Sequence, residues 1–215
     1  MCGRFENRLS LAEIVALYGL QTGGMAPNLK PRADIRPTET IPAVRMGVAG
    51  RELAMLRWWL VPSWAEEAGS DYPMFNARAE TIATRKSFAG PFRHRRCLIP
   101  ASGFYEWRKD GTGRKTRFLI TARSGAPLSF AGIWERNDHL GIESCAIITT
   151  PANRLMQPIH DRMPAIIDPR DHAAWLEAPR SDLLRPAPEE ALIVRPVRRD
   201  IRDDDPPEPL LTGLL

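Results

Sequence analysis

Alternating apolar and polar positions run through the middle of the chain and predict a series of short β-strands. Clear turn sequences separate several of them, such as Asp110-Gly111-Thr112-Gly113 and Ala49-Gly50-Arg51. Short strands joined by tight turns favour antiparallel pairing. The expected strands cover residues 41–48, 53–61, 96–99, 103–108, 116–121, 129–135, 143–149, 165–167 and 191–197.

Two stretches have helical rather than strand character. Ser10 and Glu13 form a capping-box pattern ahead of apolar residues at helical spacing, and Gly19 supplies the stop, so a helix is expected over residues 10–20. A second helix is expected to start at Asp168, with Pro169 in its first turn, and to run to about residue 177. Residues 23–37 and 62–73 contain many turn-forming residues and predict irregular loops.

Strands and helices do not alternate along the chain, which argues against a parallel βαβ array. The pattern instead predicts an α+β protein with a mainly antiparallel, β-barrel-like core and peripheral helices. A length of 215 residues suits one domain over residues 1–215. The tail over residues 203–215 is acidic and proline-rich, and we expect it to be partly disordered.

Composition is that of an ordinary soluble globular protein, with 43% hydrophobic and 26% charged residues. The net charge is +4, from 30 basic and 26 acidic residues, and almost all the positive charge is arginine. This excess permits a nucleic-acid partner without requiring one, although the arginine fork matches phosphate geometry. We find neither a signal peptide nor an apolar run long enough to cross a membrane, so a cytoplasmic protein is expected, associated with the nucleoid when DNA-bound.

Three cysteines make an odd number without metal-like spacing, so neither a disulfide framework nor a metal site is expected. Cys97 and Cys145 lie in apolar strand segments and predict buried structural residues. Cys2 differs because removal of Met1 leaves an α-amine beside its thiol. Their ordinary pKa values, about 7.7–8.0 and about 8.5, make both groups partly nucleophilic at neutral pH. Such an aminothiol condenses with an aldehyde to a Schiff base and then a thiazolidine; the alternative is an idle cysteine on a frayed terminus.

Two polar residues stand out beside aromatic ones. Asn76 follows Phe75, and it either orients a reacting group or caps a helical turn. Glu106 stands between Tyr105 and Trp107 in an expected strand. Alternation places Glu106 on the face of Phe104, which predicts partial desolvation and a raised carboxyl pKa; the alternative is an outward-facing carboxylate.

His160 is the best catalytic candidate among the four histidines. It lies next to Asp161 and Arg162 in a polar segment bounded by prolines. The alternative is a histidine that only makes a structural hydrogen bond. We identify no glycine-rich phosphate loop and no cofactor motif.

Five segments, taken in order, resemble the SOS response-associated peptidase (SRAP) family, whose members are abasic-site processing proteins. The resemblance covers residues 2–175. Its segments are Met1-Cys2-Gly3-Arg4-Phe5, Val61-Pro62-Ser63-Trp64, Asn76-Ala77-Arg78-Ala79-Glu80-Thr81, Gly103-Phe104-Tyr105-Glu106-Trp107 and Ile159-His160-Asp161-Arg162-Met163-Pro164.

The resemblance implies a β-barrel-like fold with a positively charged cleft for single-stranded DNA. It also implies a monomer whose Cys2 forms a thiazolidine cross-link with the aldehyde of an abasic site. The positions that match the family's active site are Cys2, Asn76, Glu106 and His160. Those that match its DNA contacts are Arg4, Arg78, Arg162, Trp64, Pro37 and Thr149.

The chain departs from the family pattern at two places within residues 2–175, and the segment Arg202-Asp203-Asp204-Asp205-Pro206 beyond them matches poorly. Asp34-Ile35-Arg36-Pro37 stands where members usually have Asn-x-Ala-Pro, and Ala65 follows Trp64 where some have a second tryptophan. The first departure predicts altered binding at this loop. The second weakens a double-aromatic wedge.

We assign Asn76 to orienting Cys2, Glu106 to acid/base steps of the condensation, and His160 to acid catalysis of sugar opening. Two other functions remain open. A cysteine peptidase or autoprotease would use Cys2 as nucleophile and His160 as base. A non-catalytic single-strand binding module would explain the arginines and Trp64 but not Cys2, Glu106 and His160 together.

Overall fold

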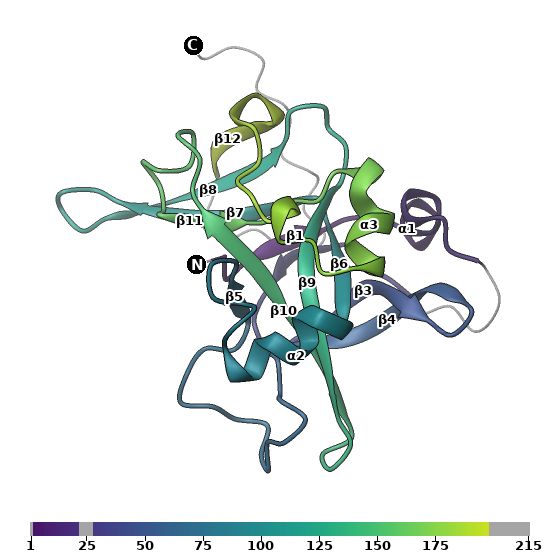
Figure 1. Ribbon diagram of the computed structural model, residues 1–215. Helices are drawn as coiled ribbons and strands as arrows, with labels where there is room; N and C mark the ends of the chain where they lie inside the picture. The colour runs from purple at the N-terminus through teal and green to yellow at the C-terminus, as the bar shows by residue number, and fades with distance from the viewer. Residues whose placement is uncertain (1, 22–27, 198–215) are drawn as a thin grey trace.

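The computed structural model describes residues 2–21 and 28–197, and its centre is a closed five-stranded barrel (Figure 1). Antiparallel pairs join the barrel strands in the order β4, β3, β6, β9, β10, and a parallel pair between β10 and β4 closes the ring. These strands are β3 (Thr40–Gly47), β4 (Gly50–Trp58), β6 (Arg96–Ala101), β9 (Leu128–Asn137) and β10 (Ile142–Pro151). Two short strands, β5 (Asn76–Arg78) and β11 (Arg162–Pro164), add to β10.

A second, wholly antiparallel sheet packs against the barrel. Its order is β12-β8-β7-β1-β2. Phe5 and Phe104 from this sheet both place their rings about edge-on to Phe130 of the barrel, at 5.8 and 6.0 Å between centroids. The strands are β1 (Phe5–Asn7), β2 (Arg32–Ile35), β7 (Gly103–Lys109), β8 (Lys115–Ala122) and β12 (Leu192–Val197).

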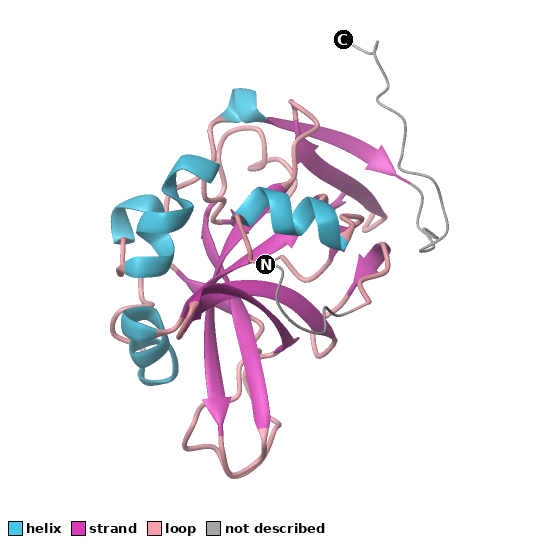
Figure 2. Cartoon of the chain, turned by 90° about the vertical axis from the view of Figure 1, so that its right-hand side faces the viewer, coloured by secondary structure: helices cyan, strands magenta, loops and turns pink. Residues whose placement is uncertain are grey.

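The α-helices of the described residues lie around the outside of the strands (Figure 2). They are α1 (Leu11–Tyr18), α2 (Lys86–His94) and α3 (His172–Glu177), and short 3₁₀ turns occupy Pro169–Asp171, Ser181–Leu183 and Glu189–Ala191. The described residues form two hydrophobic cores, and successive side chains of β6 point into different ones. Cys97 lies in the core between the barrel and the second sheet, and Leu98 lies in the core beneath the helices. Trp175 of α3 donates its indole N–H to the Cys97 carbonyl oxygen at 2.9 Å.

The α+β fold with a mainly antiparallel, barrel-like core is confirmed. The capping box at the start of α1 is present, since Ser10 Oγ accepts from Glu13 N and Glu13 Oε2 accepts from Ser10 N. Gly19 ends the helix with φ of 61°. Asp168 accepts from the Arg170 N–H and so caps the 3₁₀ turn Pro169–Asp171, which leads directly into α3. Cys97 and Cys145 are buried and unpaired.

Four expectations are corrected. Residues 32–35, expected in a loop, form β2, because pairing with β1 supplies hydrogen bonds that local sequence does not reveal. The expected strand over 165–167 gives way to β11 at 162–164, which pairs with the end of β10, and Ile166 makes only an isolated bridge. The structure also contains strand β1 and helix α2, which the sequence pattern does not predict. Helix α2 contains Pro91, a residue that normally argues against a helix. The predicted acidic tail and residues 23–27 lie outside the described residues.

Candidate active site

Strand pairing brings Cys2 to Glu106. Phe5 pairs with Phe104 in the antiparallel β1–β7 ladder, and the Tyr105 N–H donates to the Arg4 carbonyl oxygen at 2.9 Å. This register carries the chain ahead of β1 toward Glu106. Cys2 is fully buried, and its Sγ donates to the Arg4 carbonyl oxygen at 3.8 Å.

Burial changes the chemistry expected of the Cys2 thiol. Removal from water raises the pKa of the thiol far above its ordinary value, and the nearby Glu106 carboxylate acts in the same direction. The ordinary thiol pKa expected from the sequence therefore does not apply to this buried side chain. The sulfur is a thiol that must lose its proton to a base as it reacts.

Asn76 holds the backbone of Cys2. It begins β5, which runs parallel to β10, and its Nδ2 donates to the Cys2 carbonyl oxygen at 2.9 Å. This is the contact that the predicted orienting role requires. The alternative of a helix cap is wrong, because Asn76 lies in a strand. Its Oδ1 is buried, and none of the described residues donates to it.

Glu106 is a buried carboxyl group, only 3% exposed. Burial raises its pKa to about 8; the Asp161 carboxylate adds to this shift, and a backbone hydrogen bond from Trp107 opposes it. The predicted desolvation is confirmed, and the outward-facing alternative is wrong. At neutral pH the group is mostly protonated, yet its pKa lies close enough to 7 for it to donate and accept protons.

His160 has two competing partners at one nitrogen. Nδ1 accepts from the Arg162 N–H at 3.0 Å and lies 2.8 Å from Asp161 Oδ1. One nitrogen cannot accept from the first and donate to the second at once. Burial lowers the pKa of the imidazole, and Asp161 opposes this effect. In the form that accepts from the Arg162 N–H, Nδ1 carries no proton.

The predicted DNA-binding residues fall into different environments. Arg78 is exposed. Arg162 is 8% exposed, and its Nη2 donates to Glu80 Oε2 at 2.9 Å and to the Thr149 carbonyl oxygen at 2.6 Å. Thr149 is fully buried. Glu80 belongs to the Asn76–Thr81 segment and holds the guanidinium of Arg162, a role that only its position two residues after Arg78 indicates in the sequence.

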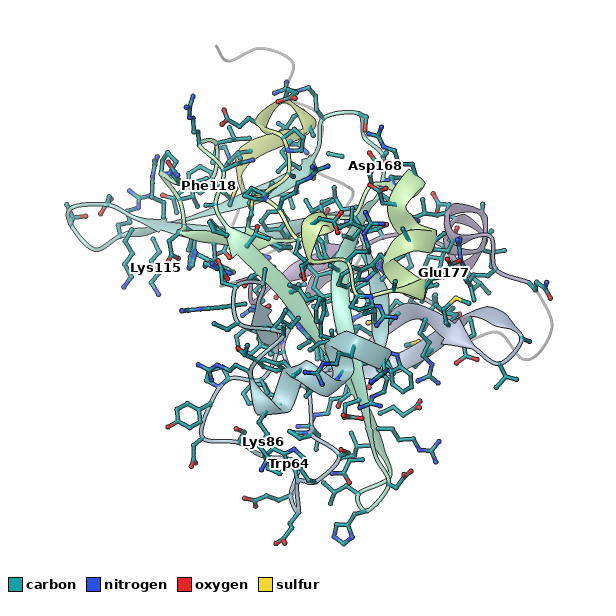
Figure 3. All side chains as sticks on the ribbon, viewed as in Figure 1. Trp64, Lys86, Lys115, Phe118, Asp168 and Glu177 are labelled. Atoms are coloured by element: carbon teal, nitrogen blue, oxygen red, sulfur yellow. The ribbon has the colours of Figure 1, made fainter. Side chains whose placement is uncertain are left out.

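The remaining three lie outside this group. Arg4 donates from Nη1 to Asp34 Oδ1 at 2.7 Å. Pro37 is half-buried in the turn after β2. Trp64 is 57% exposed, and the Lys86 ammonium lies 4.6 Å from its ring centroid, as their neighbouring positions in Figure 3 show. An exposed indole beside a cation is suited to stacking on a base.

Within residues 2–21 and 28–197, we find no group of three His, Cys, Asp or Glu side chains placed to hold a metal ion. The helices of that part of the chain are all too short or too polar to span a membrane.

Sequence comparison matches residues 1–203 to the family described as SOS response associated peptidase (SRAP). The chain belongs to the SRAP family. Among SRAP relatives, the abasic site processing protein YoaM of Bacillus subtilis is 36% identical over 179 residues, covering 82% of this chain and 79% of YoaM. The abasic site processing protein YedK of Escherichia coli is 30% identical over 183 residues, covering 82% and 79%.

Solved structures agree with this SRAP assignment at the level of fold. A crystal structure of a protein from Bacteroides thetaiotaomicron has a TM-score of 0.84 and 26% sequence identity, covering 95% of this chain and 97% of that one.

Proposed function

We propose that this SRAP protein processes abasic sites in single-stranded DNA by forming a thiazolidine cross-link through Cys2. The observation that carries the proposal is the placement of Cys2: its carbonyl is held by Asn76, and its thiol lies beside a buried carboxyl group with a pKa of about 8. The named activity of the relatives YoaM and YedK supports an abasic site as the substrate.

The reaction begins at the α-amine exposed when Met1 is removed. Its nitrogen bonds to the aldehyde carbon and gives a carbinolamine, which loses water to become a Schiff base. The thiol sulfur then bonds to the same carbon, and its proton passes by way of a base to the nitrogen. One aldehyde and one aminothiol thus yield one thiazolidine and one water.

Glu106 suits both proton transfers. Its protonated carboxyl group donates to the departing hydroxyl of the carbinolamine, and the carboxylate left behind accepts the thiol proton. A thiol with a raised pKa needs such a base. The same protonated thiol disfavours the peptidase alternative, in which a Cys2 thiolate would attack first.

His160 is assigned to opening the deoxyribose ring, which is mostly closed in an abasic site. His160 Nδ1 accepts from the Arg162 N–H, and the proposed role requires the ring to donate a proton to the sugar ring oxygen. Arg4 and Arg78 are proposed to bind the DNA phosphates on either side of the abasic sugar. Arg162, held by Glu80 and Thr149, remains a predicted contact whose guanidinium is already largely engaged.

The decisive experiment is mass spectrometry of the protein mixed with abasic single-stranded DNA. We expect a heat-stable adduct that maps to Cys2 and is lost in Cys2→Ala or when residues are added ahead of Cys2. Cys97→Ser and Cys145→Ser serve as matched controls and should retain it. Cross-linking by Cys2→Ala at the wild-type level would refute the mechanism, and binding without any adduct would favour the binding-module alternative.

The roles of Glu106 and His160 are separated by single-turnover cross-linking rates on two substrates. Glu106→Gln should slow the reaction on an abasic site and on DNA that carries a free aldehyde. His160→Ala should slow it on the abasic site alone, because the free aldehyde needs no ring opening. An equal loss on both substrates would exclude our role for His160.

A further inference from the structure

Asp34, at the departure from the family pattern, is the centre of an arginine cluster. Its carboxylate accepts from Arg4 Nη1 at 2.7 Å, from Arg36 Nη2 at 2.9 Å and from Arg117 Nη2 at 3.3 Å. These three cations hold the pKa of Asp34 below its ordinary value despite the opposing effect of burial. One carboxylate therefore faces three guanidinium groups, which leaves the cluster with a local charge of about +2.

The strand register explains why the cluster forms here. Phe5 pairs with Ile35 in the antiparallel β1–β2 ladder, so the next step outward places Arg4 opposite Arg36. Like charges directly opposite each other repel. Asp34 lies two residues before Arg36, on the same face, and its carboxylate bridges the two cations.

The bridging leaves hydrogen-bond donors unused. Asp34 occupies only Nη1 of Arg4, and Nε and Nη2 of Arg36. Among the described residues, Nη2 of Arg4 and Nη1 of Arg36 have no hydrogen-bond partner. The Arg36 side chain is 58% exposed and that of Arg4 is 28% exposed, so both remain accessible to solvent. A phosphodiester, whose two non-bridging oxygens share one negative charge, matches two adjacent guanidinium groups.

We propose that Asp34 organises Arg4 and Arg36 into a phosphate-binding site, and that Arg36 supplies a DNA contact absent from the contacts predicted by resemblance. The inference rests on the proposed function, since the ligand is the backbone of the single strand. Arg4 follows Cys2 by two residues, so this phosphate belongs to a nucleotide close to the reacting abasic sugar. Asp34 is a positioning residue: it fixes the two forks without touching DNA.

The test measures binding of a single-stranded oligonucleotide without an abasic site, by fluorescence anisotropy over a series of salt concentrations. Arg36→Ala should flatten the dependence of log K on log salt by about 0.7, the contribution of one phosphate contact, which is about fivefold in affinity at roughly 0.1 M salt. Arg170→Ala is the matched control, because Arg170 is also an exposed arginine paired with an aspartate two residues earlier, Asp168. It should bind like wild type.

Organisation by Asp34 is tested in an Asp34→Asn background, where Arg36→Ala should have less than half of its effect. If Arg36→Ala leaves the salt slope unchanged, or loses no more affinity than Arg170→Ala does, the phosphate site is overturned. As long as the wild-type protein binds the oligonucleotide, this result leaves the proposed function intact. An undiminished effect in the Asp34→Asn background overturns the positioning role. If wild type does not bind the oligonucleotide, the proposed function fails and the phosphate site fails with it.

Discussion

The buried carboxyl group of Glu106 makes a prediction about stability that is independent of DNA. Its pKa of about 8 in the folded protein exceeds the ordinary 4.5, so the folded state keeps a proton that the unfolded chain releases. Stability is therefore greatest below pH 4.5 with respect to this group, and it falls as pH rises toward 8. Glu106→Gln keeps the shape of the protonated carboxyl but cannot ionise.

The pKa difference sets the size of the effect. It corresponds to about 5 kcal/mol at complete ionisation, of which about 3 kcal/mol develops between about pH 5.5 and pH 9. Glu106 is only 3% exposed, so solvent screening removes little of this penalty. The free energy of unfolding of Glu106→Gln, relative to wild type, should therefore increase by about 3 kcal/mol over that pH interval.

The assay is urea unfolding at several pH values, with the m-value monitored to verify two-state behaviour. Glu66→Gln, in an exposed loop, is the control for loss of one negative charge and should show no comparable pH dependence. A difference between Glu106→Gln and wild type that stays constant from about pH 5.5 to pH 9 would refute the raised pKa. The acid/base role proposed for Glu106 would then lose its physical basis.

Three further predictions concern stability and use urea unfolding. Arg96 is buried and donates to backbone carbonyls at the ends of α2 and α3. Arg96→Met should therefore lower the free energy of unfolding by at least about 3 kcal/mol, whereas Arg93→Met, at an exposed neighbouring position, should change it little. His172 stacks on Tyr18, and burial lowers the pKa of His172 to about 4. The free energy of unfolding of the wild-type protein should therefore fall by up to about 3 kcal/mol between pH 6.5 and pH 4, and His172→Phe should not show this loss. Thr38 has φ of 79°, which strains a β-branched residue, so Thr38→Gly should stabilise the protein by about 1 kcal/mol, and a destabilised variant would contradict this.

Local sequence was sufficient to predict a feature where one segment contains all the groups that interact. The capping box of α1 joins Ser10 to Glu13, three residues away, and the turn after Asp110 is built by that residue's own side chain. Alternation placed Glu106 on the apolar face of β7, which was enough to predict its desolvation. The groups that form these features lie within a few residues of one another, so the local order of amino acids is enough to predict them.

Only the tertiary structure decided the features that join distant segments. Asp34 and Arg4 are 30 residues apart, and Arg162 reaches Glu80 across 82. Strand β2 exists because β1 pairs with it, and the thiol of Cys2 is un-ionised because two sheets close over it. The sequence by itself determined which groups are available for chemistry and the class of fold. Their partners, burial and protonation depend on strand register and on exclusion of water, and these arise only when the whole chain has packed.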